Sequence, residues 1–223
     1  ATLESPTDEV LVACPSFVCY YEPAKLAGCR TLEVALDADW RIDLDAMEAA
    51  VTERTRLIYI ANPNNPTSTL ADRDALKRFV DRVADRAVVV LDEAYFEYAQ
   101  YDPNAPCGAE WLMQGAPIVV LRTFSKIYGL AGLRCGYAMT TPEIARALEA
   151  IRQPFNLNAI AQAAALAALN DDTWVETSLA WNREGIPLLA GALERIGARV
   201  AESGANFVFA MLGRPAETIV ARL

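Results

Sequence analysis

The sequence contains no histidine, and only three of its 20 basic residues are lysines, at positions 25, 77 and 126. Without histidine the chain cannot form a Ser-His-Asp or Cys-His catalytic group, a histidine metal site or a near-neutral imidazole base. Any proton transfer must therefore be carried out by carboxylates, tyrosine, cysteine or a lysine with a depressed pKa.

Positive charge is also scarce, since 20 basic residues stand against 29 acidic ones, for a formal net charge of -9. Nucleic acids and anionic membranes bind surfaces with clustered positive charge, so we expect neither as a partner. The longest apolar runs, such as Ala87–Leu91, are too short to span a bilayer, and no segment has the pattern of a secretory signal. The five cysteines lack Cys-x-x-Cys spacing, which indicates reduced, mostly buried residues of a cytoplasmic protein and makes a zinc cluster improbable.

Short β-branched runs alternate with helical patterns over the first 140 residues. The predicted strands are Val10–Ala13, Thr31–Leu36, Leu57–Ala61, Ala87–Leu91, Ile118–Leu121 and Cys135–Met139. Helices are predicted over Asp43–Val51 and Asp72–Val83, each with its first aspartate as N-cap. This alternation predicts an α/β domain whose mostly parallel sheet is covered by helices on both faces.

The pattern changes after Thr140, where helical stretches follow one another. We predict helices over Pro142–Ile151, Asn158–Leu169 and about 172–196, the second of them buried, and then short strands over Arg199–Ala201 and Asn206–Met211. The expected division is a large domain over residues 1–170, followed by a connecting helix and part of a small α+β domain over residues 171–223.

Lys126 is the lysine whose position indicates chemistry. It lies just past the apolar strand Ile118–Leu121, at the strand end where open α/β sheets bind their ligands. A desolvated lysine near other cations loses proton affinity and can become a Schiff-base nucleophile. The alternative is a loop lysine without a catalytic role. Lys25 and Lys77 lie in helical patterns and are expected on the surface.

Polar residues also follow two other predicted strands. Asp92 ends the strand Ala87–Leu91, and the segment Ala61-Asn-Pro-Asn-Asn-Pro-Thr67 follows Leu57–Ala61. Taken alone, Asp92 is more simply explained as the cap of a turn, and a loop would explain the prolines. Because the carboxyl ends of parallel strands meet at one edge of a sheet, we expect Asn65, Asp92 and Lys126 to converge there.

The stretch Thr123-Phe-Ser-Lys-Ile-Tyr-Gly-Leu-Ala-Gly-Leu-Arg134, with its Lys-x7-Arg spacing, is the most specific motif of the chain. With the Asn-Pro and Asp92-Glu-Ala-Tyr95 segments, it resembles the fold-type I pyridoxal-phosphate (PLP) aminotransferases and, within them, the histidinol-phosphate aminotransferase family. The resemblance runs from Pro15-Ser-Phe17 to Asn206-Phe207. It implies a three-layer α/β/α large domain, a homodimer, and amino-group transfer from histidinol phosphate to 2-oxoglutarate in histidine biosynthesis.

The resemblance also implies a role for each matching residue. Lys126 would form the Schiff base with PLP and later move the substrate's Cα proton, while Asp92 would keep the pyridine nitrogen protonated. Tyr95 and Asn65 would hydrogen-bond the phenolic oxygen of PLP. The remaining cofactor-binding residues would be Phe17, stacked on the ring, and Thr123, Ser125 and Arg134 around the phosphate.

The chain departs from the family's pattern in some places. The family's Asn-Pro-Thr-Gly is here Asn65-Pro-Thr-Ser68, so we expect the local backbone to differ. The family's segments that reach the partner subunit and grip the substrate carboxylate would lie before Ala1 and after Leu223, so the amino donor stays open. The alternatives are an aromatic amino acid aminotransferase, a threonine-phosphate decarboxylase-like enzyme, a PLP-binding regulator, which the -9 charge disfavours, or an inactive fragment.

Overall fold

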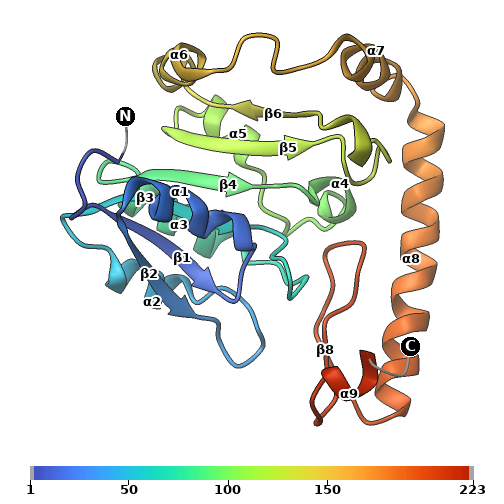
Figure 1. Cartoon of the computed structure of the whole chain (residues 1–223). Helices are drawn as coiled ribbons and strands as arrows, with labels where there is room; N and C mark the ends of the chain where they lie inside the picture. Colours follow the sequence, from blue (N-terminus) through green and yellow to red (C-terminus); the bar gives the residue numbers. More distant parts are fainter. Residues whose placement is uncertain (1–2, 221–223) are drawn as a thin grey trace.

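The computed structural model describes residues 3–220, and its centre is a six-stranded sheet with strand order β2-β1-β3-β4-β5-β6 (Figure 1). The strands are β1 (Glu9–Cys14), β2 (Arg30–Ala35), β3 (Thr55–Ala61), β4 (Val88–Asp92), β5 (Ile118–Thr123) and β6 (Gly136–Met139). All neighbouring pairs are parallel except β5 and β6, which are antiparallel. The predicted mostly parallel mixed sheet is confirmed.

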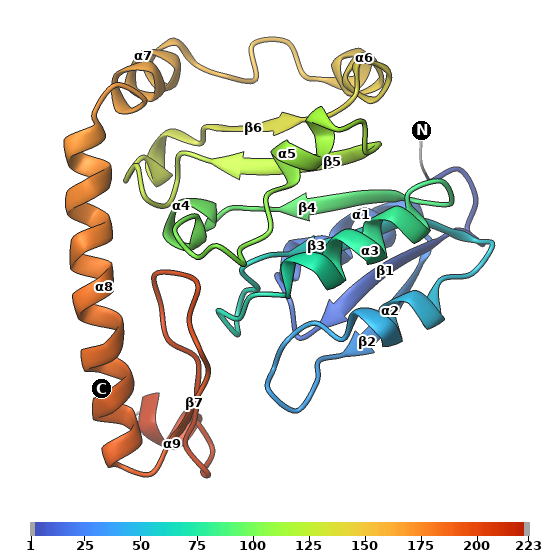
Figure 2. The same ribbon diagram turned by 180° about the vertical axis from the view of Figure 1, so that it is seen from behind.

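Helices cover both faces of this sheet, as Figures 1 and 2 show. On one face, α2 (Leu44–Ala50), α3 (Arg73–Val83) and α5 (Gly108–Met113) pack on the larger apolar core. On the other face lie α1 (Tyr21–Ala27) and α6 (Pro142–Ile151). Both predicted N-caps are confirmed, because the carboxylates of Asp43 and Asp72 accept hydrogen bonds from the backbone of the first helical turn at 2.9 and 2.8 Å.

The central strands are apolar on both sides because both of their faces are covered. Val10, Leu11 and Val12 on β1 are fully buried, with Leu11 in the core of one face and Val10 in that of the other. The polar residues of these strands are therefore confined to their ends, and this confinement places a row of functional groups along the carboxyl edge of the sheet.

The last third of the chain contains α7 (Ala159–Ala168), α8 (Asp172–Arg195), β7 (Arg199–Val200), β8 (Ala210–Met211) and α9 (Glu217–Val220). The prediction that the alanine-rich helix is buried is wrong, because Ile160 and Leu166 on α7 are 72% and 66% exposed. Only Ala161 and Ala165 of this helix are buried, in a small cluster with Phe124 and Cys135. The two predicted strands after α8 also shrink to two-residue segments.

The loop between β7 and β8 turns back toward the carboxyl edge of the main sheet (Figure 2). There the Gly204 amide donates to the carbonyl oxygen of Ser68 at 2.8 Å, and the Phe207 ring meets the Tyr95 ring edge-on at 5.2 Å. The division of the chain at residue 170 stays a prediction.

All five cysteines are free, but the expectation that most are buried is wrong. Only Cys135 is buried, Cys19 is exposed, and the others are partly exposed. Within residues 3–220, no helix is long and apolar enough to cross a membrane. The same residues contain no cluster of cysteine and carboxylate side chains that could hold a metal ion.

Candidate active site

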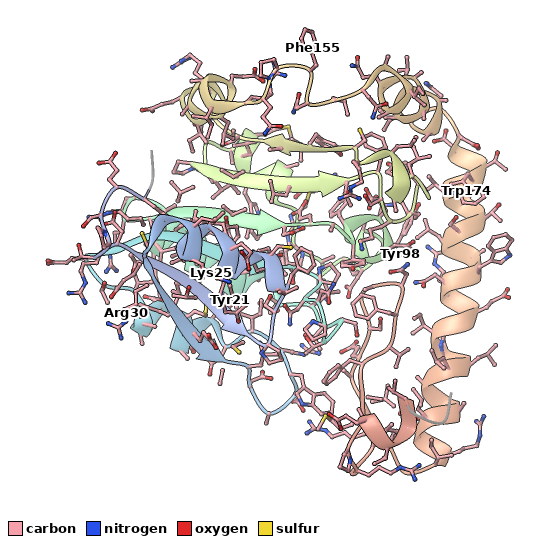
Figure 3. The ribbon with its side chains drawn as sticks, in the orientation of Figure 1. Tyr21, Lys25, Arg30, Tyr98, Phe155 and Trp174 are labelled. Atoms are coloured by element: carbon pink, nitrogen blue, oxygen red, sulfur yellow. The ribbon has the colours of Figure 1, made fainter. Side chains whose placement is uncertain are left out.

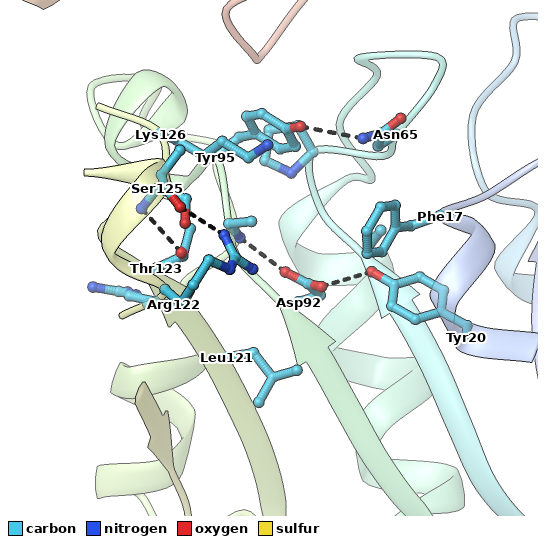
Figure 4. A pocket seen from close by; sticks show the side chains of 15 residues that line it. Phe17, Tyr20, Asn65, Asp92, Tyr95, Leu121, Arg122, Thr123, Ser125 and Lys126 are labelled. Carbon is cyan, nitrogen blue, oxygen red and sulfur yellow. Dashed lines mark hydrogen bonds between the residues drawn. The ribbon is translucent and has the colours of Figure 1, made fainter. Parts of the chain in front are cut away.

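A cavity of about 330 Å³ opens where β3, β4 and β5 end, and the side chains that line it are drawn in Figure 4. Its volume lies within the range of small-molecule sites. The structure brings all of the predicted site residues into its lining: Phe17, Asn65, Asp92, Tyr95, Thr123, Ser125, Lys126 and Arg134. They gather where neighbouring strands end, since Ala61, Asp92 and Leu121 are register partners across β3, β4 and β5.

Asp92 lies on the floor of this pocket as the last residue of β4. Its Oδ1 accepts a hydrogen bond from the Ala94 amide at 3.0 Å, and its Oδ2 accepts one from the Tyr20 hydroxyl at 2.8 Å. Burial raises the pKa of Asp92, while these hydrogen bonds and the charge of Lys126 act in the opposite direction. No lysine or arginine in residues 3–220 forms an ion pair with it, so the carboxylate is suited to receive a cationic group of a ligand.

Lys126 lies across the pocket from this carboxylate. Its Nζ is 4.9 Å from the centre of the Tyr95 ring and forms no ion pair within the described part of the chain. By contrast, Lys77 pairs with Asp81 at 2.6 Å, and Lys25 is exposed on α1, where Figure 3 labels it. Among the three lysines, Lys126 alone has its amine free beside a cavity.

One wall of the pocket is formed by Tyr95 and Asn65. The Tyr95 side chain is 6% exposed, and its hydroxyl accepts a hydrogen bond from the Asn65 amide at 3.2 Å. Both groups are directed to the same side of the pocket as Lys126 (Figure 4). A ligand oxygen between them would therefore meet a hydroxyl and an amide.

The opposite end of the pocket carries hydroxyl and guanidinium groups. Thr123 Oγ1 accepts from the Ser125 amide at 3.0 Å and donates to the Cys135 carbonyl at 3.3 Å. Arg134 follows the short helix η2 (Ala131–Leu133) with φ of 57°, and its guanidinium donates to the Ala131 carbonyl at 2.8 Å. This collection of donors suits an anionic oxygen group.

The sequence reasoning did not identify Tyr20, which belongs to the short helix η1 (Val18–Tyr20). Its side chain is 4% exposed, lines the pocket and contacts Asp92. The signal was its spacing from Phe17, because a separation of three residues brings both aromatic rings to one side of a helical turn. The two rings meet edge-on at 5.6 Å.

Arg122 was also missed, although it precedes the predicted motif directly. It lines the pocket, its guanidinium lies 3.6 Å above the centre of the Phe96 ring, and it forms an ion pair of 2.8 Å with Glu93. Glu93 also accepts a hydrogen bond from the Gly108 amide at 2.6 Å. This pair joins the residue after β4, which ends at Asp92, to β5, whose end is followed by Lys126.

Ser68 stands where the family has glycine, and its backbone has φ of 61°, in the left-handed region that favours glycine. The residue is fully buried, and its hydroxyl donates to the Thr67 carbonyl. The serine side chain is thus accommodated in a backbone conformation that glycine adopts more readily, and the expected difference from the family's local backbone stays a prediction.

Together, the sheet and the pocket define an α/β protein with a small-molecule site at the carboxyl edge of its sheet. The sequence profile of the family described as "Aminotransferase class I and II" matches residues 1–222. The chain belongs to this family.

Individual relatives agree with this assignment. The chain is 43% identical to a histidinol-phosphate aminotransferase of Moorella thermoacetica over 100% of its own length and 57% of the relative. It is 46% identical to an aromatic amino acid aminotransferase of Nocardia farcinica, over 95% of the chain and 60% of the relative.

Solved structures show the same fold. A histidinol-phosphate aminotransferase of Sinorhizobium meliloti, in complex with pyridoxal-5'-phosphate, superposes with a TM-score of 0.88 and 30% identity over 98% of this chain and 59% of that one. A putative histidinol-phosphate aminotransferase of Erwinia carotovora atroseptica gives a TM-score of 0.93 at 28% identity, over 99% of this chain and 64% of that one. The chain thus spans less than two thirds of each of these relatives.

Proposed function

We propose that this chain forms the cofactor-binding part of a PLP-dependent aminotransferase that uses histidinol phosphate as amino donor and 2-oxoglutarate as acceptor. The observation that carries the proposal is that the Asp92 carboxylate and the Lys126 amine line one pocket, and that neither forms an ion pair within residues 3–220. The names of the relatives support the same reaction class.

The residues present fit the parts of PLP. Asp92 would face the ring nitrogen, because a partly buried carboxylate is stabilised by a cation. Tyr95 and Asn65 would hold the phenolic oxygen, and the exposed face of Phe17 would cover the ring. Thr123, Ser125 and Arg134 would bind the phosphate.

PLP supplies an electron-accepting ring for carbanion chemistry at the substrate Cα. The protein's own contribution is to hold and move protons. Asp92, as a carboxylate, would keep the ring nitrogen protonated, and the Lys126 amine would take the proton from the substrate Cα and return it at C4′ of the cofactor. A lysine that serves as both attachment point and base explains why a chain without histidine can catalyse this reaction.

The substrate can be tested with the full-length enzyme. We expect histidinol phosphate, with 2-oxoglutarate, to give a higher kcat/KM than phenylalanine or tyrosine. The second candidate is an aromatic amino acid aminotransferase, which the 46% identity to the Nocardia farcinica relative favours. A higher kcat/KM for phenylalanine would select this second candidate, and turnover without any 2-oxo acid would reject transamination.

We further propose a cytoplasmic homodimer. Large apolar side chains stay exposed on the outer elements, among them Phe155, Trp181 and Leu188 at 96%, 64% and 73% (Phe155 is labelled in Figure 3). Surfaces of this kind are typical of contact with another chain or another part of the same protein.

A further inference from the structure

Tyr20 connects two walls of the pocket. Its hydroxyl donates to Asp92 Oδ2 at 2.8 Å, and its ring stacks on the Tyr59 ring at 4.7 Å with an interplanar angle of 5°. Phe17 meets the same ring edge-on at 5.6 Å. The Tyr20 ring is thus fixed from two sides, and its hydroxyl has one acceptor within the described structure.

The bond to Asp92 does more than satisfy a buried hydroxyl. Oδ1 of the carboxylate is already held by the Ala94 amide, which belongs to the same turn of the chain. Tyr20 holds the other oxygen from a different element, so the two donors fix the plane of the carboxylate as well as its position. A carboxylate that must meet a ligand nitrogen in one direction requires this kind of support.

We infer that Tyr20 is a positioning residue of this site, which acts through Asp92 by keeping that carboxylate ionised and directed at the ligand. The inference rests on the proposed function, in which Asp92 faces the ring nitrogen of PLP. Burial and the adjacent Asp92 charge raise the pKa of the Tyr20 hydroxyl, which favours its protonated form, the form that donates to Asp92.

Among residues 3–220, the titratable side chains that interact electrostatically with the Asp92 carboxylate include Tyr20 from η1, Tyr59 from β3, Glu93 just after β4 and Lys126 from the segment after β5. Lys126 favours the ionised form, and Glu93 opposes it. The ionised form of Asp92 is favoured by the Tyr20 hydroxyl, the Ala94 amide and the Lys126 charge. Of these three, the Tyr20 hydroxyl is the one that a substitution can remove without changing a charge or the backbone.

The test measures the pKa of Asp92 in the full-length protein without PLP. Aspartate labelled with ¹³C at its side-chain carboxyl reports each titration by NMR, and Asp92→Asn identifies the resonance. In Tyr20→Phe the rings still stack, but the donor is lost. We expect the acid dissociation constant of Asp92 to fall about tenfold or more, because the lost hydrogen bond stabilises the ionised carboxylate. Hydrogen bonds to charged groups contribute more than those between neutral groups.

Tyr59→Phe is the matched control. It removes a hydroxyl from the ring stacked on Tyr20, and no hydrogen bond of the Tyr59 hydroxyl occurs in residues 3–220. We expect the Asp92 titration in this variant to stay within twofold of the wild type. Equal shifts in both variants, or no shift in Tyr20→Phe, would overturn the inference.

A second measurement covers the case in which Tyr20→Phe does not fold. Replacement of the tyrosines by 3-fluorotyrosine keeps rings and hydroxyls and makes the hydroxyl a stronger donor. The acid dissociation constant of Asp92 is then expected to rise, and this rise should persist in the Tyr59→Phe background. An unchanged constant would contradict the role of Tyr20.

Measurements of PLP binding distinguish a failure of this inference from a failure of the proposed function. In Tyr20→Phe, the acidic limb of the PLP affinity profile should move to higher pH, because Asp92 becomes neutral earlier. With a PLP analogue whose ring nitrogen is replaced by carbon, this difference between variant and wild type should vanish. A shifted Asp92 titration in a protein that binds no PLP would reject the proposed function alone, and an unshifted one in a PLP-binding protein would reject the inference alone.

Discussion

Asp92 and Lys126 are the charged side chains on which the proposed chemistry depends, and their surroundings hold them to different degrees. Asp92 is fixed on three sides, by its strand, the Ala94 amide and the Tyr20 hydroxyl. Lys126 lies over the Tyr95 ring without a hydrogen-bond acceptor in the described part of the chain. The carboxylate is therefore held in place, while the amine is free to react.

Replacement of Asp92 by alanine should reduce transamination by roughly a hundredfold or more, as expected when a preorganised charge is lost from an active site. Attachment of PLP to Lys126 should persist, although more weakly, because that amine is unchanged. Steady-state rates and the absorbance of the bound cofactor measure the two effects separately. Unchanged turnover would reject the role of Asp92 at the ring nitrogen.

Some single residues could be predicted and others could not. Asn65, Asp92 and Lys126 were accessible because each follows an apolar run, and the ends of parallel strands meet. For Tyr20 the sequence offered only its spacing from Phe17, because its partner Asp92 lies 72 residues away and the helical turn that directs its side chain is only three residues long. Contacts of this kind depend on the assembled sheet.

Among the elements, β4 and β5 are joined by an ion pair as well as by backbone hydrogen bonds. Directly after β4, the Glu93 amide donates to the Leu121 carbonyl at 2.9 Å, and the Glu93 carboxylate pairs with Arg122 of β5. The side chains of Glu93 and Arg122 are 2% and 14% exposed, so the pair is largely shielded from solvent. We interpret it as the clamp that keeps the segments carrying Asp92 and Lys126 in register.

Arg122→Met should destabilise the protein by about 3 to 5 kcal/mol at pH 7, because it leaves a buried carboxylate unpaired. Burial already raises the pKa of Glu93, and loss of Arg122 removes an influence that lowers it. A carboxyl whose folded pKa lies above its unfolded value binds more protons when folded, so the deficit should shrink as the pH falls from 7 toward 4.

Urea unfolding of wild type and variant at both pH values measures this dependence. The double variant Glu93→Gln/Arg122→Met serves as the control, since it removes the charge as well as its partner. It should recover part of the stability at pH 7 and lose the extra pH dependence. A deficit in Arg122→Met that does not change with pH would contradict the account of the pair.

Elements were predicted well where the covered faces leave a clear apolar pattern in the sequence, and poorly where they do not. Strands covered on both faces are continuous apolar runs, α3 has one apolar face, and α2 and α3 both begin at aspartate caps. The composition of α7 resembles that of a buried helix, but only its Ala161 and Ala165 are buried. An alanine-rich sequence does not reveal which side of a helix is covered.

The whole molecule is a sheet whose carboxyl edge receives a loop from the far end of the chain. The contacts of Gly204 with Ser68 and of Phe207 with Tyr95 place the last third of the sequence against the pocket. The sequence indicated the α/β class of the sheet, but this return of the chain depends on long-range contacts that have no local pattern.

The most direct test of the proposed site is to incubate the full-length protein with PLP, reduce it with borohydride and map the labelled peptide. This chain contains only three lysines, so peptide mapping distinguishes Lys126 from the other two directly. We predict the label on Lys126 alone, because Lys25 is exposed on α1 and Lys77 is paired with Asp81. Label on Lys25 or Lys77, or no label at all, would contradict the account.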